Sequence, residues 1–304
     1  MKHISAVSIG DVTDIVAETR KKWRLREDEE IWFRGEDQRH KETTLEPKLY
    51  RDLPKSINTA PQGLLEKEAD FAEEFFRRGL ELYGREASDW EWYFLMQHHS
   101  APTRLLDWTD GAMMALHFAT RGELSNSEGA YLYVLDPFQL VDDIDVLPGQ
   151  KEIKKSWKIY REYRRKKGLS SPGGWPTVYL PGHHGLKAKS RKPRLPEESL
   201  VLEFPLMTRR IAAQHSRLIV LGTSRYWIHR YSEKSDAHIK RIDISKSNVR
   251  KIRNELRDAG VSESVIFPDL DGLGRELGQL WDQLKGRRQY RRTDNGPSLR
   301  ARRK

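Results

Sequence analysis

Apolar positions recur along this chain at two spacings, one typical of helices and one typical of strands. Apolar residues that recur every three or four positions predict amphipathic helices at 11–23, 63–83, 88–98, 110–121, 247–259 and 269–284. Short apolar runs predict strands at 30–33, 130–135, 200–204, 217–222, 238–244 and 261–267. Helices dominate the first half and strands the second, which favours an α+β fold.

One segment, 91–120, combines an unusual density of polar chemistry with core-forming residues on both sides. Its polar members are Gln97, His98, His99, Thr103, Arg104, Asp107, Trp108 and Thr109. The apolar runs before and after them are expected to anchor the segment in a core, so these groups are held rigidly. Rigid polar groups at the floor of a cleft are typical of binding and catalytic sites.

Charge is distributed unevenly along the chain. The net charge is +10, yet residues 1–150 carry 18 basic and 29 acidic side chains, whereas residues 151–194 carry 14 and 2. The tail, 285–304, carries 9 basic side chains and 1 acidic one. Concentrated positive charge attracts polyanions, because each phosphate that is neutralised releases condensed counterions. Nucleic acid is therefore an expected partner, with a merely solubilising tail as the alternative.

The basic internal segment predicts a helix at 151–168 followed by a long loop rich in proline, glycine and cations. Loops of this length are usually functional or disordered. Aromatic residues interleave with the cations, as on surfaces that stack bases: Trp157, Tyr160, Tyr163 and Trp175. We expect one domain over 1–284, with a basic insertion at about 151–194 and a flexible basic tail at 285–304.

Several protein classes are disfavoured by what the sequence lacks. There is no cysteine, so neither a disulfide framework nor a cysteine-based zinc site is possible. No apolar run approaches the roughly 18 residues that span a bilayer, and the start of the chain lacks a secretory signal pattern, so a cytoplasmic location is expected. A Walker phosphate loop and a dinucleotide GxGxxG motif are both absent, which argues against an NTPase or a dehydrogenase.

Four sequence blocks, in order, resemble the FRG domain family. They are Phe33-Arg34-Gly35 with Leu45, Pro47, Leu49 and Arg51; the run Gln97–Thr109 closing with Leu116–Ala119; Arg210–Gln214; and Glu263–Leu273. Glu36, Ser100 and Ser216 depart from the family pattern, where Gln, Gly and Gly are usual. These departures concern local turn geometry.

The layout of this family is similar to that of ADP-ribosyltransferases, which implies a split β-sheet core with helical additions and NAD as substrate. Family members occur in bacterial toxin and phage-defence settings, which implies an antitoxin or another regulatory protein as a partner. The link rests on motif order, so it is an analogy.

By this resemblance Arg34 holds NAD, because a guanidinium fork grips a pyrophosphate or ribose phosphate with two hydrogen bonds. Gly35 is expected to let the ligand approach the backbone. The alternative for Arg34 is a buried arginine paired with a core carboxylate.

The second block is expected to shape the nicotinamide side of the site. Thr103 and Thr109 supply hydroxyls, Trp108 stacks on the ring or packs in the core, and Gln214 bonds an amide or ribose or serves structure. Arg104 and Asp107 either bind the cofactor or pair with each other. His98 either faces the ligand or bonds a backbone carbonyl.

Glu263 is the expected catalytic carboxylate, placed on an apparent strand at 261–267. Cleavage of the nicotinamide bond creates an oxocarbenium-like ribose, which a fixed carboxylate stabilises. The order Arg34, Thr109, Glu263 is similar to that of the three transferase positions. The alternative is a carboxylate that pairs at a sheet edge, while Asp269 is expected to cap a helix.

The expected activity is therefore transfer of ADP-ribose from NAD to RNA or DNA, with no metal involved. Two rivals are considered. A metal-dependent nuclease would use His98, His99, His183 and His184 with Asp107, and a non-catalytic module would only bind nucleic acid.

Overall fold

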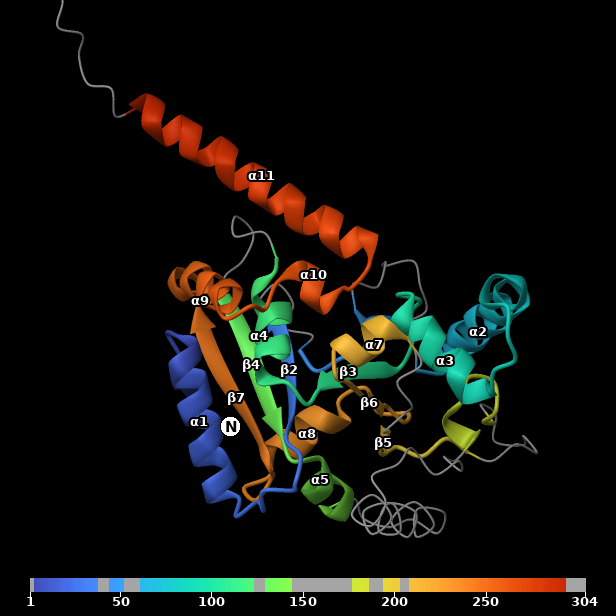
Figure 1. Ribbon diagram of the computed structural model, residues 1–304. Helices are drawn as coiled ribbons and strands as arrows, with labels where there is room; N and C mark the ends of the chain where they lie inside the picture. Colours follow the sequence, from blue (N-terminus) through green and yellow to red (C-terminus); the bar gives the residue numbers. More distant parts are fainter. Residues whose placement is uncertain are drawn as a thin grey trace, which may run out of the picture.

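The computed structural model of this chain describes residues 3–37, 44–51, 61–122, 129–143, 177–185, 194–202 and 208–293. Within them, seven strands form one mixed sheet in the order β1-β7-β4-β2-β3-β6-β5 (Figure 1). The strands are β1 (His3–Ser5), β2 (Trp32–Asp37), β3 (Leu105–Thr109), β4 (Gly129–Leu135), β5 (Leu200–Leu202), β6 (Ser216–Val220) and β7 (Ile239–Ser245). β1 is parallel to β7, and the other neighbouring strands are antiparallel. The α+β expectation is confirmed.

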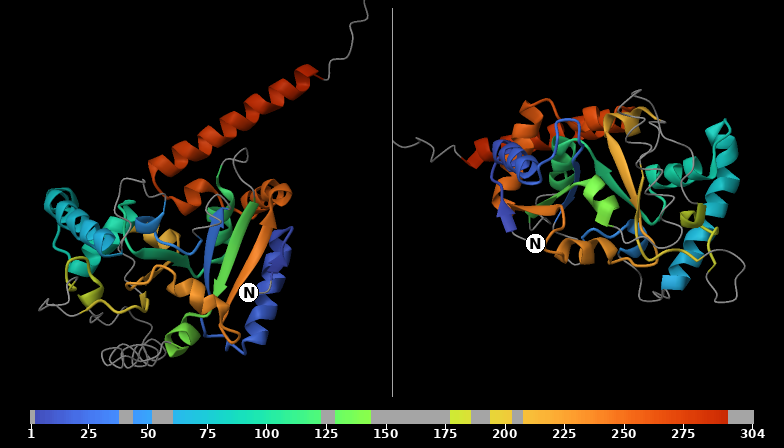
Figure 2. Two further views of the ribbon diagram at one scale, coloured as in Figure 1. Left: turned by 180° about the vertical axis from the view of Figure 1, so that it is seen from behind. Right: turned by 90° about the horizontal axis from the view of Figure 1, so that it is seen from below.

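Three helices cover one face of the β7-β4-β2 end of the sheet (Figures 1 and 2). They are α1 (Ile9–Lys22), α4 (Ala112–Thr120) and α9 (Lys246–Asp258). Each buries an apolar row against the strands, represented by Val12, Leu116 and Ile252, all fully buried. This is the packing that their helical spacing of apolar residues predicts.

A second group of helices covers the β3-β6-β5 end of the sheet. It consists of α2 (Pro61–Tyr83), α3 (Asp89–His98) and α7 (Arg209–Ala213). The opposite face of the sheet is closed by α5 (Pro137–Asp143), α8 (Trp227–Glu233) and the 3-10 turn η2 (Lys48–Tyr50). Two apolar clusters on one face and one on the other therefore form the core.

The two ends of the sheet meet at a junction where the strands separate. β2 pairs with β4 along its whole length, but it pairs with β3 only at Phe33 opposite Thr109. Beyond that pair β2 and β3 diverge, which leaves a gap in the sheet. The gap is where side chains of both strands become available to a ligand.

Gly35 lies beside this junction and is required for helix packing. A Cβ atom at this position would lie 1.7 Å from the backbone oxygen of Ala115 and 2.7 Å from the backbone nitrogen of Ala119. The missing side chain therefore lets α4 lie directly on β2. Gly35 also lines the cavity described below, but the atom that a side chain would add points at the helix, so packing against α4 is a structural reason for this glycine.

We expect Gly35→Ala to lower the free energy of unfolding by about 3 kcal/mol, because α4 must move off β2. Chemical denaturation measures the change. The matched control is Gly278→Ala in the last helix, where an added Cβ meets nothing within 4 Å. That change is expected to leave stability equal or raise it, since alanine favours helix. Equal stability of Gly35→Ala and wild type would contradict the packing argument.

The predicted strand at 261–267 is wrong. Residues Glu263–Ile266 form the short helix α10, with Ile266 and the following Phe267 buried. A short apolar run fits a strand and a buried helical turn equally well, so periodicity alone does not separate them. Glu263 therefore begins a helix.

The last helix, α11 (Leu270–Thr293), extends past the predicted end at 284 and projects away from the sheet (Figures 1 and 2). Asp269 caps it as predicted, since its Oδ1 accepts a hydrogen bond from the Gly272 nitrogen at 2.7 Å. The start of the tail expected at 285 is thus helical, and residues 294–304 lie outside the described part of the chain.

Most of the predicted basic insertion, including the helix at 151–168, also lies outside the described residues. Its described portion, 177–185, contains the 3-10 turn η3 (Thr177–Tyr179) and the buried Tyr179 and Leu180. No helix in the described part of the chain combines the length and apolar character needed to cross a membrane.

Candidate active site

A cavity of about 870 Å³ lies at the gap between β2 and β3. Its volume is in the range of roughly 300–1,000 Å³ that is usual for small-molecule sites. Helices α2, α3, α4 and α7 and the turn η2 contribute the rest of its wall. The cleft floor predicted for the 91–120 segment is therefore present.

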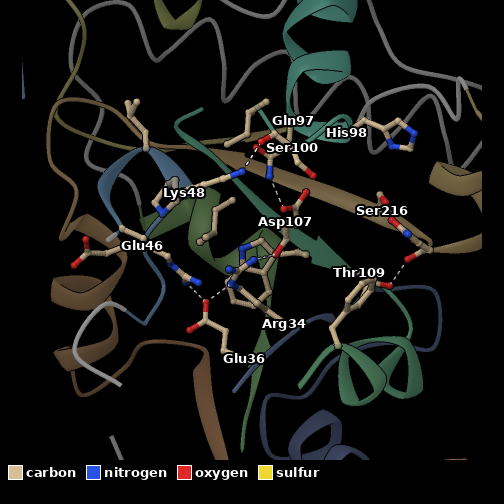
Figure 3. A pocket seen from close by; sticks show the side chains of 18 of the residues that line it. Arg34, Glu36, Glu46, Lys48, Gln97, His98, Ser100, Asp107, Thr109 and Ser216 are labelled. Carbon is tan, nitrogen blue, oxygen red and sulfur yellow. Dashed lines mark hydrogen bonds and ion pairs between the residues drawn. The ribbon is translucent and has the colours of Figure 1, made fainter. Parts of the chain in front are cut away.

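Asp107 is the carboxylate whose side chain opens into the middle of this cavity (Figure 3). Its Oδ2 accepts a hydrogen bond from Gln97 Nε2 at 2.5 Å. The Thr103 hydroxyl donates to Gln97 Oε1 and accepts from the Leu105 backbone nitrogen at 3.2 Å. Since a carboxylate only accepts, this chain of donors fixes which end of the Gln97 amide faces Asp107.

The surroundings of Asp107 raise its pKa above the ordinary value of 3.8. The surrounding cavity wall, which displaces bulk water although the side chain remains exposed to the cavity, is the main cause, and the positive charge of Arg34 opposes it. A carboxylate with a raised pKa is a better proton acceptor than an ordinary aspartate, and such groups gather at functional sites.

Arg34 crosses the gap between the diverging strands. Its Nη1 donates to the backbone carbonyl of Asp107 at 2.5 Å, and its Nε donates to Glu36 Oε1 at 2.6 Å. The alternative role considered for Arg34, pairing with a buried carboxylate, is therefore present as its contact with Glu36. Its Nη2 has no hydrogen-bond partner among the described residues and remains available to a ligand.

Glu36 is a buried anion shared by two arginines. Besides Arg34, it accepts from Arg51 Nη2 at 2.6 Å and from the Leu45 backbone nitrogen. Burial alone would raise the pKa of Glu36, but the two guanidinium groups hold it below its ordinary value. A glutamine at this position would leave two cations without their counter-charge, so Glu36 balances the charge of the cavity wall.

Residues 29–128 match the FRG domain. The match contains Arg34, Gln97 and Asp107, and thus both strands that border the gap, while α7 and α10 lie beyond it. The resemblance to the FRG domain is confirmed for the first two sequence blocks, and the blocks at 210–214 and 263–273 lie outside the match. No curated protein and no solved structure matches the chain.

The loop of the FRG domain between α3 and β3 contains a residue in the left-handed region. Ser100 has φ 64°, which explains why glycine is usual at this position. The carbonyl of Ser100 accepts a hydrogen bond from Lys48 Nζ at 2.5 Å, so a cation of the cavity wall is tied to the loop.

His98 also lines the cavity, at the end of α3. Burial, with Arg210 and His99 nearby, lowers its pKa to about 4. The imidazole is therefore neutral near pH 7 and can serve as a hydrogen-bond partner for a ligand.

Three other predicted site residues, Thr109, Trp108 and Gln214, line the cavity but make contacts within the fold. The buried Thr109 hydroxyl donates to the backbone oxygen of Gln214 at 2.8 Å and accepts from the Gly111 nitrogen at 3.1 Å. Trp108 is buried in the apolar cluster that η2, α5 and α8 cover. The Gln214 amide reaches the backbone oxygen of Ile266 at 3.4 Å, a long contact.

Arg104 lies away from the cavity, and its predicted pairing with Asp107 is wrong. It is fully buried, and its Nε donates to Glu68 Oε2 at 2.5 Å. The remaining guanidinium hydrogens reach the backbone oxygens of Leu221 and Tyr179. Glu68 was missed in the sequence, although an acidic residue on the apolar face of 63–83, beside Leu64 and Leu65, was a signal.

Glu263 is not among the residues that line the cavity. It is buried, with Oε2 3.1 Å from His117 Nε2 and Oε1 2.7 Å from Arg275 Nε. These contacts join α10 to α4 and α11. The structure therefore does not bring Arg34 and Glu263 together across the cavity, and the carboxylate that faces Arg34 there is Asp107.

The environment of Glu263 predicts a stabilising role. Burial would raise its pKa, but hydrogen bonds from His117 and Arg275 lower it from 4.5 to about 2. A depressed pKa means stability that is present above pH 4.5 and lost as the pH falls toward 2. We expect Glu263→Gln to lower the free energy of unfolding at pH 7 by about 3 kcal/mol. Denaturation at pH 7 and at pH 3 measures it, and an equal loss at both pH values would contradict the assignment.

The histidines of the proposed metal site do not gather. No group of three His, Asp or Glu side chains suited to a metal occurs in the described parts of the chain. His183 lies 3.8 Å from Asp89, and His184 is buried. The metal-dependent nuclease thus gains no support from the described residues.

Proposed function

We propose that this protein cleaves the nicotinamide bond of NAD and transfers ADP-ribose to nucleic acid, with the cavity between β2 and β3 as its site. The observation that carries the proposal is Asp107. A carboxylate with a raised pKa, fixed by Gln97, faces a cavity large enough for a nucleotide.

The chemistry needs one well-placed carboxylate. When the bond between ribose C1′ and the nicotinamide nitrogen breaks, its electron pair leaves with neutral nicotinamide and the ribose becomes oxocarbenium-like. Ionised Asp107 stabilises that cation, as carboxylates do in glycoside hydrolysis. The acceptor oxygen or nitrogen then bonds to C1′, and its proton passes to Asp107 and on to solvent. In this scheme Asp107 replaces Glu263 as the reacting carboxylate.

The charges of the cavity wall suit an anionic substrate. Six cations and four carboxylates line it, and Arg34 presents beside Asp107 an Nη2 that has no partner within the described ranges. Guanidinium groups bind phosphates with two hydrogen bonds, which orients the substrate as well as holding it. Burial of part of the adenine or nicotinamide ring against Phe94 and Phe118 would add apolar contact.

The acceptor is inferred from charge. The internal basic segment and the basic tail would attract the phosphates of RNA or DNA. Such an activity suits a toxin or phage-defence effector that a regulatory protein holds in check.

The test is incubation of the full chain with NAD labelled in its adenylate phosphate, together with RNA, DNA and protein. We expect release of nicotinamide and label in RNA or DNA. Label in protein would show that the acceptor is protein and not nucleic acid. Tight, salt-sensitive RNA binding without nicotinamide release would favour a binding module, and nucleic-acid cleavage that chelators abolish would favour a nuclease. Either result would overturn the proposal.

A further inference from the structure

Three arginines from separate helical elements surround one phenylalanine ring at the side of the cavity. The guanidinium carbons of Arg121, Arg210 and Arg275 lie 4.9, 4.5 and 4.8 Å from the centroid of Phe267. Arg121 follows α4, Arg210 lies in α7, and Arg275 lies in α11. Stacking on the ring favours each cation separately, but three like charges at one ring repel one another.

The carboxylates near these arginines compensate them incompletely. Glu263 binds Arg275 and also attracts Arg121. Asp269 interacts with Arg210 while its Oδ1 is used to cap α11, and Asp107 acts on Arg210 as well but already interacts with Arg34. Burial, together with Arg275 and Arg121, lowers the pKa of Arg210 below its ordinary value. The cluster therefore retains positive charge that a bound anion would neutralise.

Two of the arginines have hydrogen-bonding capacity to spare. The buried Nε of Arg210 has no hydrogen-bond partner in the described parts of the chain. Arg121 forms no ion pair or hydrogen bond with any described residue. Both line the cavity that contains Asp107. A buried donor without a partner is costly, and a ligand oxygen would satisfy it.

We propose that Arg121 and Arg210 bind the diphosphate of a dinucleotide substrate, with Arg275 reinforcing the charge. This rests on the proposed function and assigns the diphosphate end of the same site. The stacked ring holds the guanidinium planes in place, so their edges can each offer paired donors to phosphate oxygens. The diphosphate is favoured over the phosphates of the acceptor because both arginines belong to the wall of the cavity.

The test is calorimetric binding of inorganic pyrophosphate, ADP and uncharged adenosine to the full chain. We expect Arg121→Gln and Arg210→Gln each to weaken pyrophosphate and ADP by about 10- to 100-fold. Adenosine binding is expected to be unchanged. Arg210→Lys should restore part of the affinity, since it keeps the charge but lacks the fork. The matched control is Arg209→Gln, on the same helix but outside the cavity wall.

Unchanged ADP affinity in both folded variants would overturn the assignment. If ADP affinity is unchanged but binding of a short RNA is weakened, the assignment is also overturned. These arginines would then bind the phosphates of the acceptor. Nicotinamide release is measured in parallel. If the variants lose ADP binding but the wild type does not cleave NAD, the proposed function is refuted and the diphosphate site still stands. If the wild type cleaves NAD and both variants keep its KM, the diphosphate site is refuted and the proposed function still stands.

A second, independent feature is a row of exposed leucines on α11. The helix projects from the sheet (Figure 1). Its leucines follow one another at alternating spacings of three and four residues. They are Leu270, Leu273, Leu277, Leu280 and Leu284, with exposures of 86, 45, 56, 52 and 46%. This spacing is the seam of a coiled coil, and exposed apolar rows mark interaction surfaces.

We infer that the row docks antiparallel on α11 of a second copy of this chain. Charge decides the orientation. Asp269 and Asp271 lie at one end of the row and Lys285 lies at the other, all exposed. In an antiparallel pair centred on Leu277, Lys285 of each copy meets the aspartates of its partner, whereas a parallel pair sets lysine beside lysine. The existing contact of Lys285 with exposed Asp282 is weak by comparison with a buried seam.

Sedimentation equilibrium of the full chain tests this. We expect a dimer that Leu277→Asn with Leu280→Asn converts to a monomer, while Leu82→Asn, an exposed leucine of α2, has no effect. Lys285→Glu should weaken the dimer, and adding Asp271→Lys should restore it. A monomeric wild type at all concentrations would overturn the inference, as would a dimer unaffected by the leucine changes.

Discussion

Asp107→Asn is expected to reduce cleavage of NAD by about 10³-fold or more, while the chain stays folded. The amide keeps the shape of the side chain but carries no negative charge for the oxocarbenium-like ribose, and it accepts no proton from the acceptor. Its NH₂ group also faces Gln97 Nε2 or forces that amide to turn. Nicotinamide release under saturating NAD, with thermal unfolding as the check on folding, measures the effect.

The matched control is Asp136→Asn, which removes a buried carboxylate outside the cavity wall. Assayed where it is folded, it should retain most of the wild-type rate. The raised pKa of Asp107 adds a second readout, because activity needs the ionised form. The rate should fall on the acidic side at a higher pH than an ordinary aspartate would give. Full activity of Asp107→Asn would move the chemistry away from this carboxylate.

Arg104→Met is expected to lower the free energy of unfolding by about 3–5 kcal/mol, the largest effect on stability that we anticipate. The change leaves Glu68 as an unpaired anion in a site where both side chains are 0% exposed. Tyr93 also donates to Glu68 Oε1, and the Arg104 backbone nitrogen does so at 2.7 Å, so the carboxylate organises the junction of α2, α3 and β3. Urea denaturation of the full chain measures the loss.

A double-mutant cycle with Glu68→Leu separates the pair from its surroundings. The double variant should recover part of the loss, with a coupling energy of about 1–3 kcal/mol. Recovery is incomplete because the backbone oxygens of Leu221 and Tyr179 lose their donors. Strict additivity of the two single changes would show that Arg104 and Glu68 act independently, contrary to their 2.5 Å contact.

Sequence periodicity predicted the long amphipathic helices well because each buries one apolar stripe. Helices at 9–22, 61–83, 89–98, 112–120 and 246–258 lie within a few residues of the prediction. β3 was missed because the sequence pattern assigns its five residues, which lie between Pro102 and Gly111, to the connection between two helices. The strand expected around Glu263 failed for a related reason, because four residues do not distinguish a helical turn from a strand.

The candidate site was predicted in composition but not in geometry. The 91–120 segment does supply Gln97 and Asp107, and Arg34 does reach the same cavity. The partners of charged groups, however, come from distant parts of the chain. Arg104 was paired with its near neighbour Asp107, while its real partner, Glu68, precedes it on another helix. Such choices depend on tertiary packing, which spacing along the chain does not encode.

The separation of β2 from β3 has a mechanical consequence. In the described structure, backbone pairing between β2 and β3 at that line is limited to one residue pair. The Arg34 side chain and the ion pair between Glu30 and Arg217 also connect the two halves of the sheet there. A molecule bound there would take the place of the absent interstrand hydrogen bonds. Ligand binding would then reduce the motion of the two halves of the sheet relative to each other. In the unliganded protein, this motion is expected to be largest along this line.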